Sequence, residues 1–474
     1  MPRIQDDCQT GSRAVAARRG SAGGLLAGAC VVAALVTLTA TQLPAQQVGR
    51  IPYETYTLPN GLTVVLSEDH STPIITVNVW YHVGSANERP HRSGFAHLFE
   101  HMMFQGSAHV KKSEHMQLVE RAGGSMNGST REDRTNYFET LPSNRLNLGL
   151  WLEADRMRSL AVTQATFENQ RQTVKEERRL GVDNQPYSKA FLDGLTLPFD
   201  SGGCFAYAHT VIGDMADLDS AKVEDVQAFF NQYYAPNNAV LTVVGDFDPT
   251  SARLLIQQYY GDIPRVPDAA PVACAVQYGT GQRRMEQTDN NANLPLVGFI
   301  YRTPPQRDAD TPALELLASI LGAGESSRLN RALVREARAA VTAGSFNRPD
   351  REASVMIVFG IDNQGVAAAR VDSLLNAAVD QLRNDTVSTA ELIKAKNQYR
   401  ADAIRERQTT MGVAEALQTA LWYAGSLEDA NHDVALHLAV TTADLQRVAR
   451  RYLDPANRLT LIVNPPAGKG GAGQ

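Results

Sequence analysis

The chain has 474 residues, of which 43% are hydrophobic and 20% are charged, and its formal net charge is −6. This length predicts two or three domains, each large enough to bury its own core. The pI of about 6.0 and the lack of basic stretches beyond the N-terminus give no general attraction for nucleic acid, so we expect no nucleic-acid partner.

Residues 1–45 have the layout of a secretory signal peptide. A leader with four arginines precedes the uncharged apolar run 23–40, and small residues follow near Ala40 and Ala45. This order is typical of a signal peptide, so we expect cleavage near Ala45 and export to a bacterial periplasm. The alternative is an uncleaved N-terminal membrane anchor, since about 18 apolar residues can just span a bilayer.

The chain after the leader begins with strand patterns. "YETYTLPNGLTVVLSED" (53–69) carries an Asn-Gly turn before an alternating run, which predicts a hairpin. A second strand is expected in 74–85, a helix in "SGFAHLFEHMMFQGS" (93–107), a pair of strands in 123–141, and helices in 144–158 and 165–180.

Two distant segments share one plan, which indicates a duplication. "VEDVQAFFNQYYAPNNAVLTVVGDFDP" (223–249) and "TADLQRVARRYLDPANRLTLIVNPP" (442–466) each contain a helix, a Pro-x-Asn break and an apolar strand. We therefore predict two homologous α+β domains. The expected limits are an N-terminal domain at 46–265, a Pro/Gly-rich linker at 266–288, a C-terminal domain at 289–465 and a disordered tail at 466–474.

Two cysteines, Cys204 and Cys274, lie beyond the leader. An oxidising compartment would permit a bridge between them. Two unpaired cysteines are equally consistent with the sequence.

The expected helix at 93–107 places His97, Glu100 and His101 in an apolar run. Histidines at i and i+4 lie one turn apart on one face, where they can share an ion. Two imidazoles, a third ligand and an open position for water make a catalytic zinc site, and a neighbouring carboxylate can take the proton of the water. The matching helix of the second half, "ALELLASILG" (313–322), has no histidine, which favours chemistry over packing. The third ligand is left open between Glu176 and Glu177, either of which could simply be solvated.

The H-x-x-E-H order is the inverzincin pattern. Together with "GGSMNGSTREDRTNYFETLP", "EADRM", "TVKEERR" and "YYAPNNAVLTVVGDFDP", it resembles the M16 (pitrilysin/insulinase-like) zinc metallopeptidases, in particular the short bacterial branch similar to mitochondrial processing peptidase subunits. The resemblance covers nearly the whole mature chain in order. It implies His97, His101 and Glu177 as ligands of one Zn²⁺ per chain, and Glu100 as general base. It also implies two domains that each pack a mostly antiparallel sheet with helices, and endopeptidase activity on peptides or unfolded segments.

Two positions depart from the family pattern. Gln170 stands where a further glutamate is expected, so only a neutral hydrogen bond could tune the metal there. Arg335 matches an arginine that the family directs to the bound peptide, but Thr342 replaces the accompanying tyrosine. The support for a developing oxyanion is therefore incomplete, and we expect a heterodimer with a homologous zinc-less subunit that closes a chamber, or else a homodimer.

The segment 123–141 is similar to the family's substrate-side edge strand. Peptide binding is expected there through Asn127 and Gly128, by β-augmentation, with Arg335 as a further contact. Glu153 and Asp155 are interpreted as helix-surface or structural charges. The rival hypotheses are a non-catalytic scaffold subunit of the same fold and a site for manganese or cobalt, which the same ligand set permits.

Overall fold

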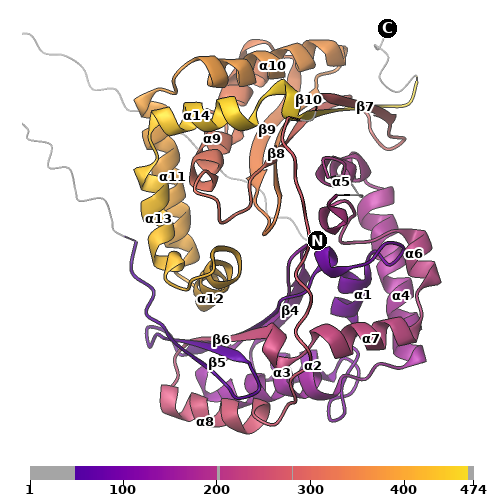
Figure 1. Ribbon diagram of the computed structural model, residues 1–474, viewed down its shortest axis with the longest axis vertical. Helices are drawn as coiled ribbons and strands as arrows, with labels where there is room; N and C mark the ends of the chain where they lie inside the picture. The colour runs from indigo at the N-terminus through magenta and orange to yellow at the C-terminus, as the bar shows by residue number, and fades with distance from the viewer. Residues whose placement is uncertain (1–47, 200–202, 280, 468–474) are drawn as a thin grey trace, which may run out of the picture. The chain divides into compact units, whose positions relative to one another are not determined.

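The computed structural model of the protein describes residues 48–199, 203–279 and 281–467 (Figure 1). The expected signal peptide and most of the expected tail lie outside the described residues. Within the described ranges, no helix combines the length and apolar character needed to cross a bilayer.

The first half is built on a six-stranded sheet with the order β1-β2-β6-β3-β5-β4. The neighbours are antiparallel except for the parallel pair β2–β6. The predicted Asn-Gly turn joins β1 to β2, and β4 forms an edge of the sheet. The strands are β1 (Glu54–Thr57), β2 (Thr63–Glu68), β3 (Ile74–Tyr81), β4 (Ser125–Thr130), β5 (Thr135–Pro142) and β6 (Ala239–Gly245).

The second half repeats this plan in a five-stranded sheet with the order β7-β11-β8-β10-β9. Again only the outer pair, β7 and β11, is parallel. The strands are β7 (Arg283–Thr288), β8 (Leu296–Thr303), β9 (Ala340–Arg348), β10 (Ser354–Asp362) and β11 (Arg458–Asn464). β7, β11, β8, β10 and β9 take the places of β2, β6, β3, β5 and β4, so the predicted duplicated α+β fold is confirmed.

The end of the expected linker differs from the prediction. Residues 283–288 form β7 and pair along their length with β11. The polar run "RRMEQT" has no buried residue, so no apolar pattern marked it as a strand. Its place in the sheet comes from backbone pairing with β11 rather than from burial of its side chains.

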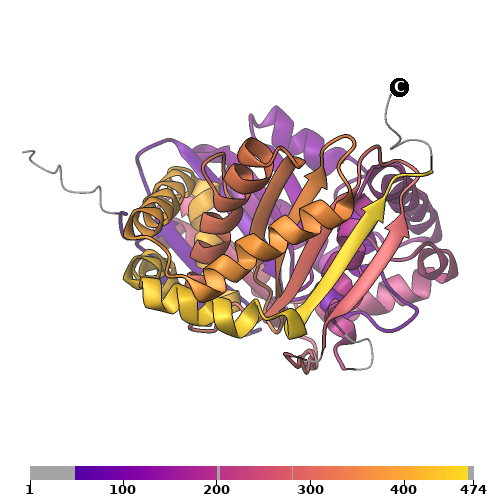
Figure 2. The same cartoon turned by 90° about the horizontal axis from the view of Figure 1, so that it is seen from above.

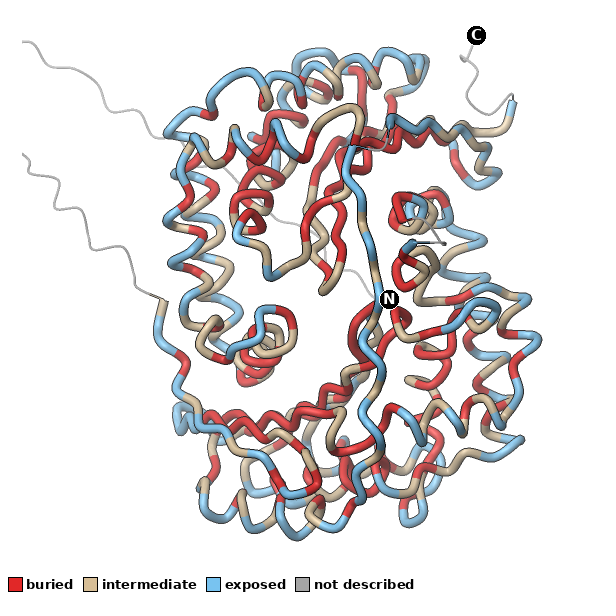
Figure 3. Tube along the Cα trace, in the orientation of Figure 1, coloured by how far each residue is buried: buried red, intermediate tan, exposed pale blue. Residues whose placement is uncertain are grey.

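The helices of the two halves also follow parallel orders. Those of the first half are α1 (Phe95–Met102), α2 (Glu114–Arg121), α3 (Leu146–Ser159), α4 (Gln164–Arg178), α5 (Ser188–Thr196), α6 (Met215–Ser220), α7 (Val223–Tyr233) and α8 (Pro249–Tyr260). Those of the second half are α9 (Thr311–Gly322), α10 (Ala368–Asn384), α11 (Thr389–Glu406), α12 (Thr410–Thr419), α13 (Asp429–Ala439) and α14 (Thr442–Tyr452). α10 and α14 lie across one face of the second sheet (Figure 2), and Figure 3 shows the central strands as buried.

One helix of each half packs on the sheet of the other half. α12 lies on the first sheet, where Glu415 accepts a hydrogen bond from Asn78 Nδ2 (2.8 Å) and Leu417 packs with Val65. α5 lies on the second sheet, where Leu195 packs with Leu461. The face of each sheet is therefore buried partly by a helix from the other half.

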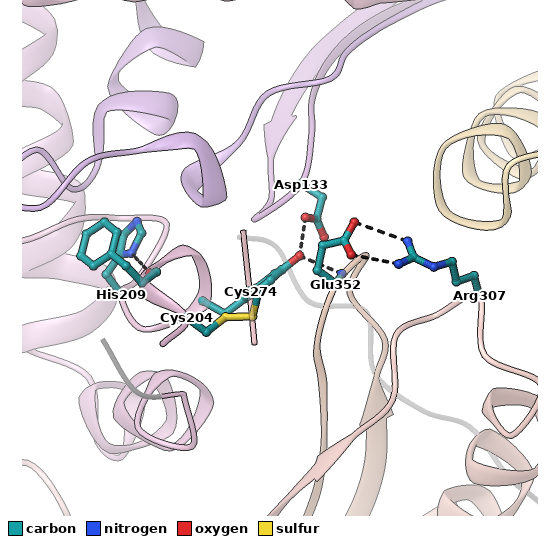
Figure 4. Close-up of a disulfide and its surroundings, with 8 residues drawn as sticks. Asp133, Cys204, His209, Cys274, Arg307 and Glu352 are labelled. Atoms are coloured by element: carbon teal, nitrogen blue, oxygen red, sulfur yellow. Dashed lines mark hydrogen bonds and ion pairs between the residues drawn. A yellow bond between two sulfur atoms is a disulfide. The ribbon is translucent and has the colours of Figure 1, made fainter. Parts of the chain in front are cut away.

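A disulfide joins Cys204 to Cys274 (Figure 4). Cys274 belongs to residues 264–279, which contain no helix or strand, and Cys204 precedes the short helix Phe205–Tyr207. The bridge fixes the connection between the halves to the first half, and it resolves the question that the sequence left open.

The acidic residues of α3 are not surface charges, which corrects part of the interpretation made from the sequence. Glu153 is 0% exposed and Asp155 is 4% exposed. Arg156 Nε donates to Glu153 (2.9 Å), and His109 Nδ1 lies 2.6 Å from Asp155 Oδ1. Buried charges are tolerated when they are paired, so these carboxylates have structural roles.

Candidate metal centre

Helix α1 buries one side and keeps its reactive side chains on the other. Phe95, Leu98, Phe99 and Met102 are buried in the core of the first half, whereas His97, Glu100 and His101 are only partly buried. The helix starts after Gly94, which has a φ of +85°, and a Cβ there would meet Gly213 Cα at 2.8 Å. The backbone N–H groups of Gly94 and Ala96 donate to the buried carboxylate of Glu88, which satisfies donors that a helix start leaves free.

Helix α4 packs against α1 and brings Glu177 to the two histidines. Glu177 Oε1 lies 3.7 Å from His97 Nε2, and Glu177 Oε2 lies 3.2 Å from His101 Nε2. One potential ligand atom from each of the three residues lies within 4.8 Å of the others. Two imidazole nitrogens and a carboxylate are a donor set that suits Zn²⁺ and leaves a coordination position open. The structure thus brings together the three predicted ligands, and Glu176 instead forms an ion pair with Arg179 (3.0 Å).

Gln170 supports one of the histidines. Its Oε1 lies 3.3 Å from His101 Nδ1, and since an amide oxygen can only accept, the Nδ1–H group donates. This tautomer leaves the Nε2 lone pair directed to Glu177. Such outer partners fix the orientation of a metal-ligating imidazole, and the neutral hydrogen bond expected at this position is present.

Glu100 lies beside the cluster without being part of it. Its Oε2 accepts a hydrogen bond of 2.6 Å from Thr130 Oγ1 at the end of β4. Burial raises the pKa of Glu100, and the Thr130 bond partly opposes that rise. Burial and the neighbouring His101 lower the pKa of His97 to about 4. A neutral imidazole is the form that binds a metal ion.

The predicted peptide contacts Asn127 and Gly128 lie on β4. Asn127 is exposed, and a Cβ at Gly128 would meet Tyr137 Cδ1 at 3.0 Å and Phe104 Cζ at 3.2 Å. In the part of the chain that the structure describes, β4 pairs only with β5. Its outer edge therefore keeps backbone groups that an extended peptide could pair with.

The other predicted contact lies in the second half. Arg335 is exposed in the π-helical turn Asn330–Glu336, and Thr342 is exposed on β9 opposite Ile361. No hydrogen bond or ion pair among the described residues joins Arg335 to His97, His101 or Glu177. The structure therefore does not bring Arg335 together with the three candidate ligands.

Two features of the site region were missed from the sequence. Thr130 lies within a segment that the sequence singled out, and the period-two alternation of β4 could have placed it on the same side as Gly128, toward Phe104. A second group of potential ligands, His115, Glu139 and Glu153, is fully buried. These three residues come from α2, β5 and α3, and no spacing in the sequence connects them.

The fold and the cluster together define a duplicated α+β protein with a candidate zinc site on the first half, and known proteins share this organisation. The family model "Insulinase (Peptidase family M16)" matches residues 63–195, and the model "Peptidase M16 inactive domain" matches residues 220–399. The chain is 30% identical to the zinc protease PqqE of Helicobacter pylori over 416 residues, which are 87% of this chain and 93% of that protein.

Two further similarities agree. The chain is 24% identical over 420 residues to a probable mitochondrial-processing peptidase subunit beta of Arabidopsis thaliana, covering 84% of this chain and 75% of that protein. The crystal structure of a protease from Helicobacter pylori superposes with a TM-score of 0.82 at 30% identity, covering 88% of this chain and 100% of that one. The chain belongs to the M16 peptidase family.

Proposed function

We propose that this chain is a zinc-dependent endopeptidase that cleaves peptides or unfolded polypeptide segments. The observation that carries the proposal is the convergence of His97, His101 and Glu177, with the partly buried carboxylate of Glu100 next to them. Manganese or cobalt would suit the same donors, but zinc is the metal named in the related proteases.

Each residue of the candidate site would have its own role in peptide hydrolysis. When bound by His97, His101 and Glu177, zinc would supply Lewis-acid polarisation and lower the pKa of a water molecule. Glu100 would accept a proton from water and pass it to the leaving amine, and burial raises the pKa of this carboxyl. Thr130 holds the Glu100 carboxylate in place. The free edge of β4, with Asn127 and Gly128, would hold the peptide backbone by strand addition.

The second chain of the proposed assembly is a homologous subunit without zinc. Thr342 supports this proposal, since this chain lacks a phenol that could stabilise an oxyanion at that position. The name of the Arabidopsis relative as a subunit beta also supports a two-chain assembly. In this arrangement Arg335 would contact substrate across a closed chamber, and a homodimer is the alternative.

We also propose export to the periplasm, with cleavage near Ala45. The Cys204–Cys274 disulfide supports this location, because disulfides persist in oxidising compartments and are rare in the cytosol. N-terminal sequencing of the protein recovered from a periplasmic fraction would test it. A retained leader in a membrane fraction would favour the anchor instead.

The deciding experiment compares the wild type with Glu100→Gln on a fluorogenic unfolded peptide. We expect kcat to fall by about 10²–10⁴-fold, the usual contribution of general acid–base catalysis, while zinc stays at one ion per chain. Glu176→Gln is the matched control, because Glu176 is exposed and faces Arg179 rather than the cluster, and it should keep full activity. If the wild type binds one zinc but cuts no peptide, alone or with a homologous partner, the chain is a non-catalytic scaffold subunit.

A further inference from the structure

The turn between β4 and β5 is held by both halves of the molecule. Asp133 is the centre of this turn and is 4% exposed. Its Oδ1 accepts from the hydroxyl of Tyr207 (2.6 Å), and its Oδ2 accepts from the backbone N–H of Arg351 (2.8 Å). Its carbonyl accepts from Trp422 Nε1 (3.0 Å). Tyr207 belongs to the first half, and the other two donors belong to the second.

The partners of Asp133 are themselves fixed. Tyr207 is 2% exposed, follows the disulfide-bonded Cys204 by three residues, and accepts from the backbone N–H of Glu352 (3.0 Å). Glu352 in turn pairs with Arg307 (3.0 Å), and Figure 4 shows this chain of contacts between the disulfide and Arg307. A further contact between the halves joins Arg348 to Glu132, the neighbour of Asp133. The anchoring is therefore a network and not a single contact.

The same turn leads directly to the candidate general base. The backbone N–H of Arg131 donates to the carbonyl of Arg134 (2.8 Å), and Arg134 Nη1 donates to the carbonyl of Ser129 (2.7 Å). Thr130 lies in the chain between Ser129 and Arg131, and its hydroxyl donates to Glu100 Oε2 (2.6 Å). A shift of the turn would displace this hydroxyl, because only two residues separate Asp133 from Thr130.

We propose that Asp133 is a positioning residue, through which the second half of the chain holds Thr130, and thus Glu100, in the productive geometry. This inference rests on the proposed peptidase function. The inference gives the second half, whose described residues include no candidate zinc site, a role inside this chain. The second half need not contact the cluster of His97, His101 and Glu177, because it holds the β4–β5 hairpin that orients Glu100.

The test is a double-mutant cycle with Asp133→Asn and Thr130→Val. An asparagine amide has one acceptor oxygen, so either Tyr207 O–H or Arg351 N–H loses its partner. We expect Asp133→Asn to lower kcat about tenfold, since small misplacements of catalytic groups are costly, with zinc content unchanged and KM within about twofold. In the Thr130→Val background, Asp133→Asn should lower kcat little further, because the residue acts through Thr130.

Two more arms keep the test decisive. Trp422→Phe removes the indole donor to the Asp133 carbonyl but keeps an aromatic ring beside His82 and Arg351, and it serves if Asp133→Asn folds poorly. Asp262→Asn, which removes an exposed partner of Arg158, is the control and should leave kcat unchanged. Hydrogen exchange of the amides in 125–134 provides a readout without turnover, and it should be faster in Asp133→Asn and Trp422→Phe than in the wild type.

Fold-changes that simply multiply in the double variant, or unchanged kcat in Asp133→Asn, would overturn the proposal. If the wild type hydrolyses no peptide, the proposed function fails separately, and hydrogen exchange then decides. Exchange at wild-type rates in both variants would show that Asp133 does not hold the turn, whereas faster exchange would support the anchoring.

Discussion

Helices α1 and α9 occupy the same place in the two halves and share one pattern of burial. When residues 95–102 are set against 313–320, every position that is buried in α1 is also buried in α9. His97 and His101 then correspond to Glu315 and Ser319, which are partly buried as they are, and Glu100 corresponds to the buried Ala318. The two histidines of α1 therefore lie at positions that the packing of this helix does not need, whereas the position of Glu100 holds a small buried residue in α9.

The difference teaches that the fold and the site make separate demands on one helix. Both helices satisfy the fold with one apolar side. Each also packs against the edge strand of its own sheet, β4 or β9, and against a later helix, α4 or α11. In α9 the corresponding polar position, Glu315, accepts a hydrogen bond from His437 Nε2 (2.8 Å) and stabilises contact with α13. In α1 the same position faces Glu177. The two halves diverged in what their partly buried positions contact, while their cores kept one pattern.

The largest expected effect tests whether only the first half binds zinc. Glu177→Ala should reduce bound zinc from one ion per chain to none and abolish peptide hydrolysis. A residue that binds the metal directly matters more than a residue that only contacts a ligand, and loss of the latter already lowers metal affinity by about 10–100-fold. Elemental analysis of protein purified without added zinc would measure this. Glu176→Ala is the control and should keep one ion. One ion retained in Glu177→Ala would place it elsewhere, for instance at the buried group of His115, Glu139 and Glu153.

A second effect tests whether the two helices are equivalent as packing elements. Leu98 is 0% exposed and Leu316 is 1% exposed, and they occupy matching positions. Truncation of each to alanine should lower the free energy of unfolding by about 2–5 kcal/mol, measured by urea denaturation of the metal-free protein. A much smaller loss for Leu98→Ala would mean that α1 depends on its ion for stability, and the equivalence would be broken.

A smaller effect concerns the outer partner of the metal ligands. Gln170→Leu removes the acceptor for His101 Nδ1, and we expect zinc affinity to fall about 10–100-fold. Gln170→Glu should instead tighten zinc binding, because a carboxylate at His101 Nδ1 makes the imidazole a stronger metal ligand. Competition with a chromogenic chelator would rank the three proteins. Equal affinity in all three would show that the 3.3 Å contact does not orient the ligand.

The sequence predicted the features that depend on local patterns. Helices α3 and α4 begin within two residues of their expected starts, the Asn-Gly hairpin is present, and the duplication is visible in two matching Pro-x-Asn breaks. It could not predict β7, whose strand depends on a partner about 175 residues away in the chain. Nor could the sequence predict the contact of Thr130 with Glu100 or the hydrogen bonds that hold Asp133. These join segments from distant parts of the chain, and only the tertiary fold brings them together.

A gradual, pH-dependent effect comes from Glu139, a buried carboxylate of the first half that lies against His115. Burial raises the pKa of Glu139 from its ordinary 4.5 to about 7, although Arg156 opposes the rise. Between these values the folded protein keeps a proton that the unfolded chain has released. The stability from Glu139 is therefore complete below pH 4.5 and is lost as the pH rises to about 7, by at most about 1.4 kcal/mol per pH unit. Urea unfolding of metal-free protein across this range should show a shallower decline in Glu139→Gln, whereas Glu120→Gln, an exposed change on α2, should follow the wild type. Equal slopes in all three proteins would mean that Glu139 is ionised in the fold, and that Arg156 neutralises it as well as Glu153.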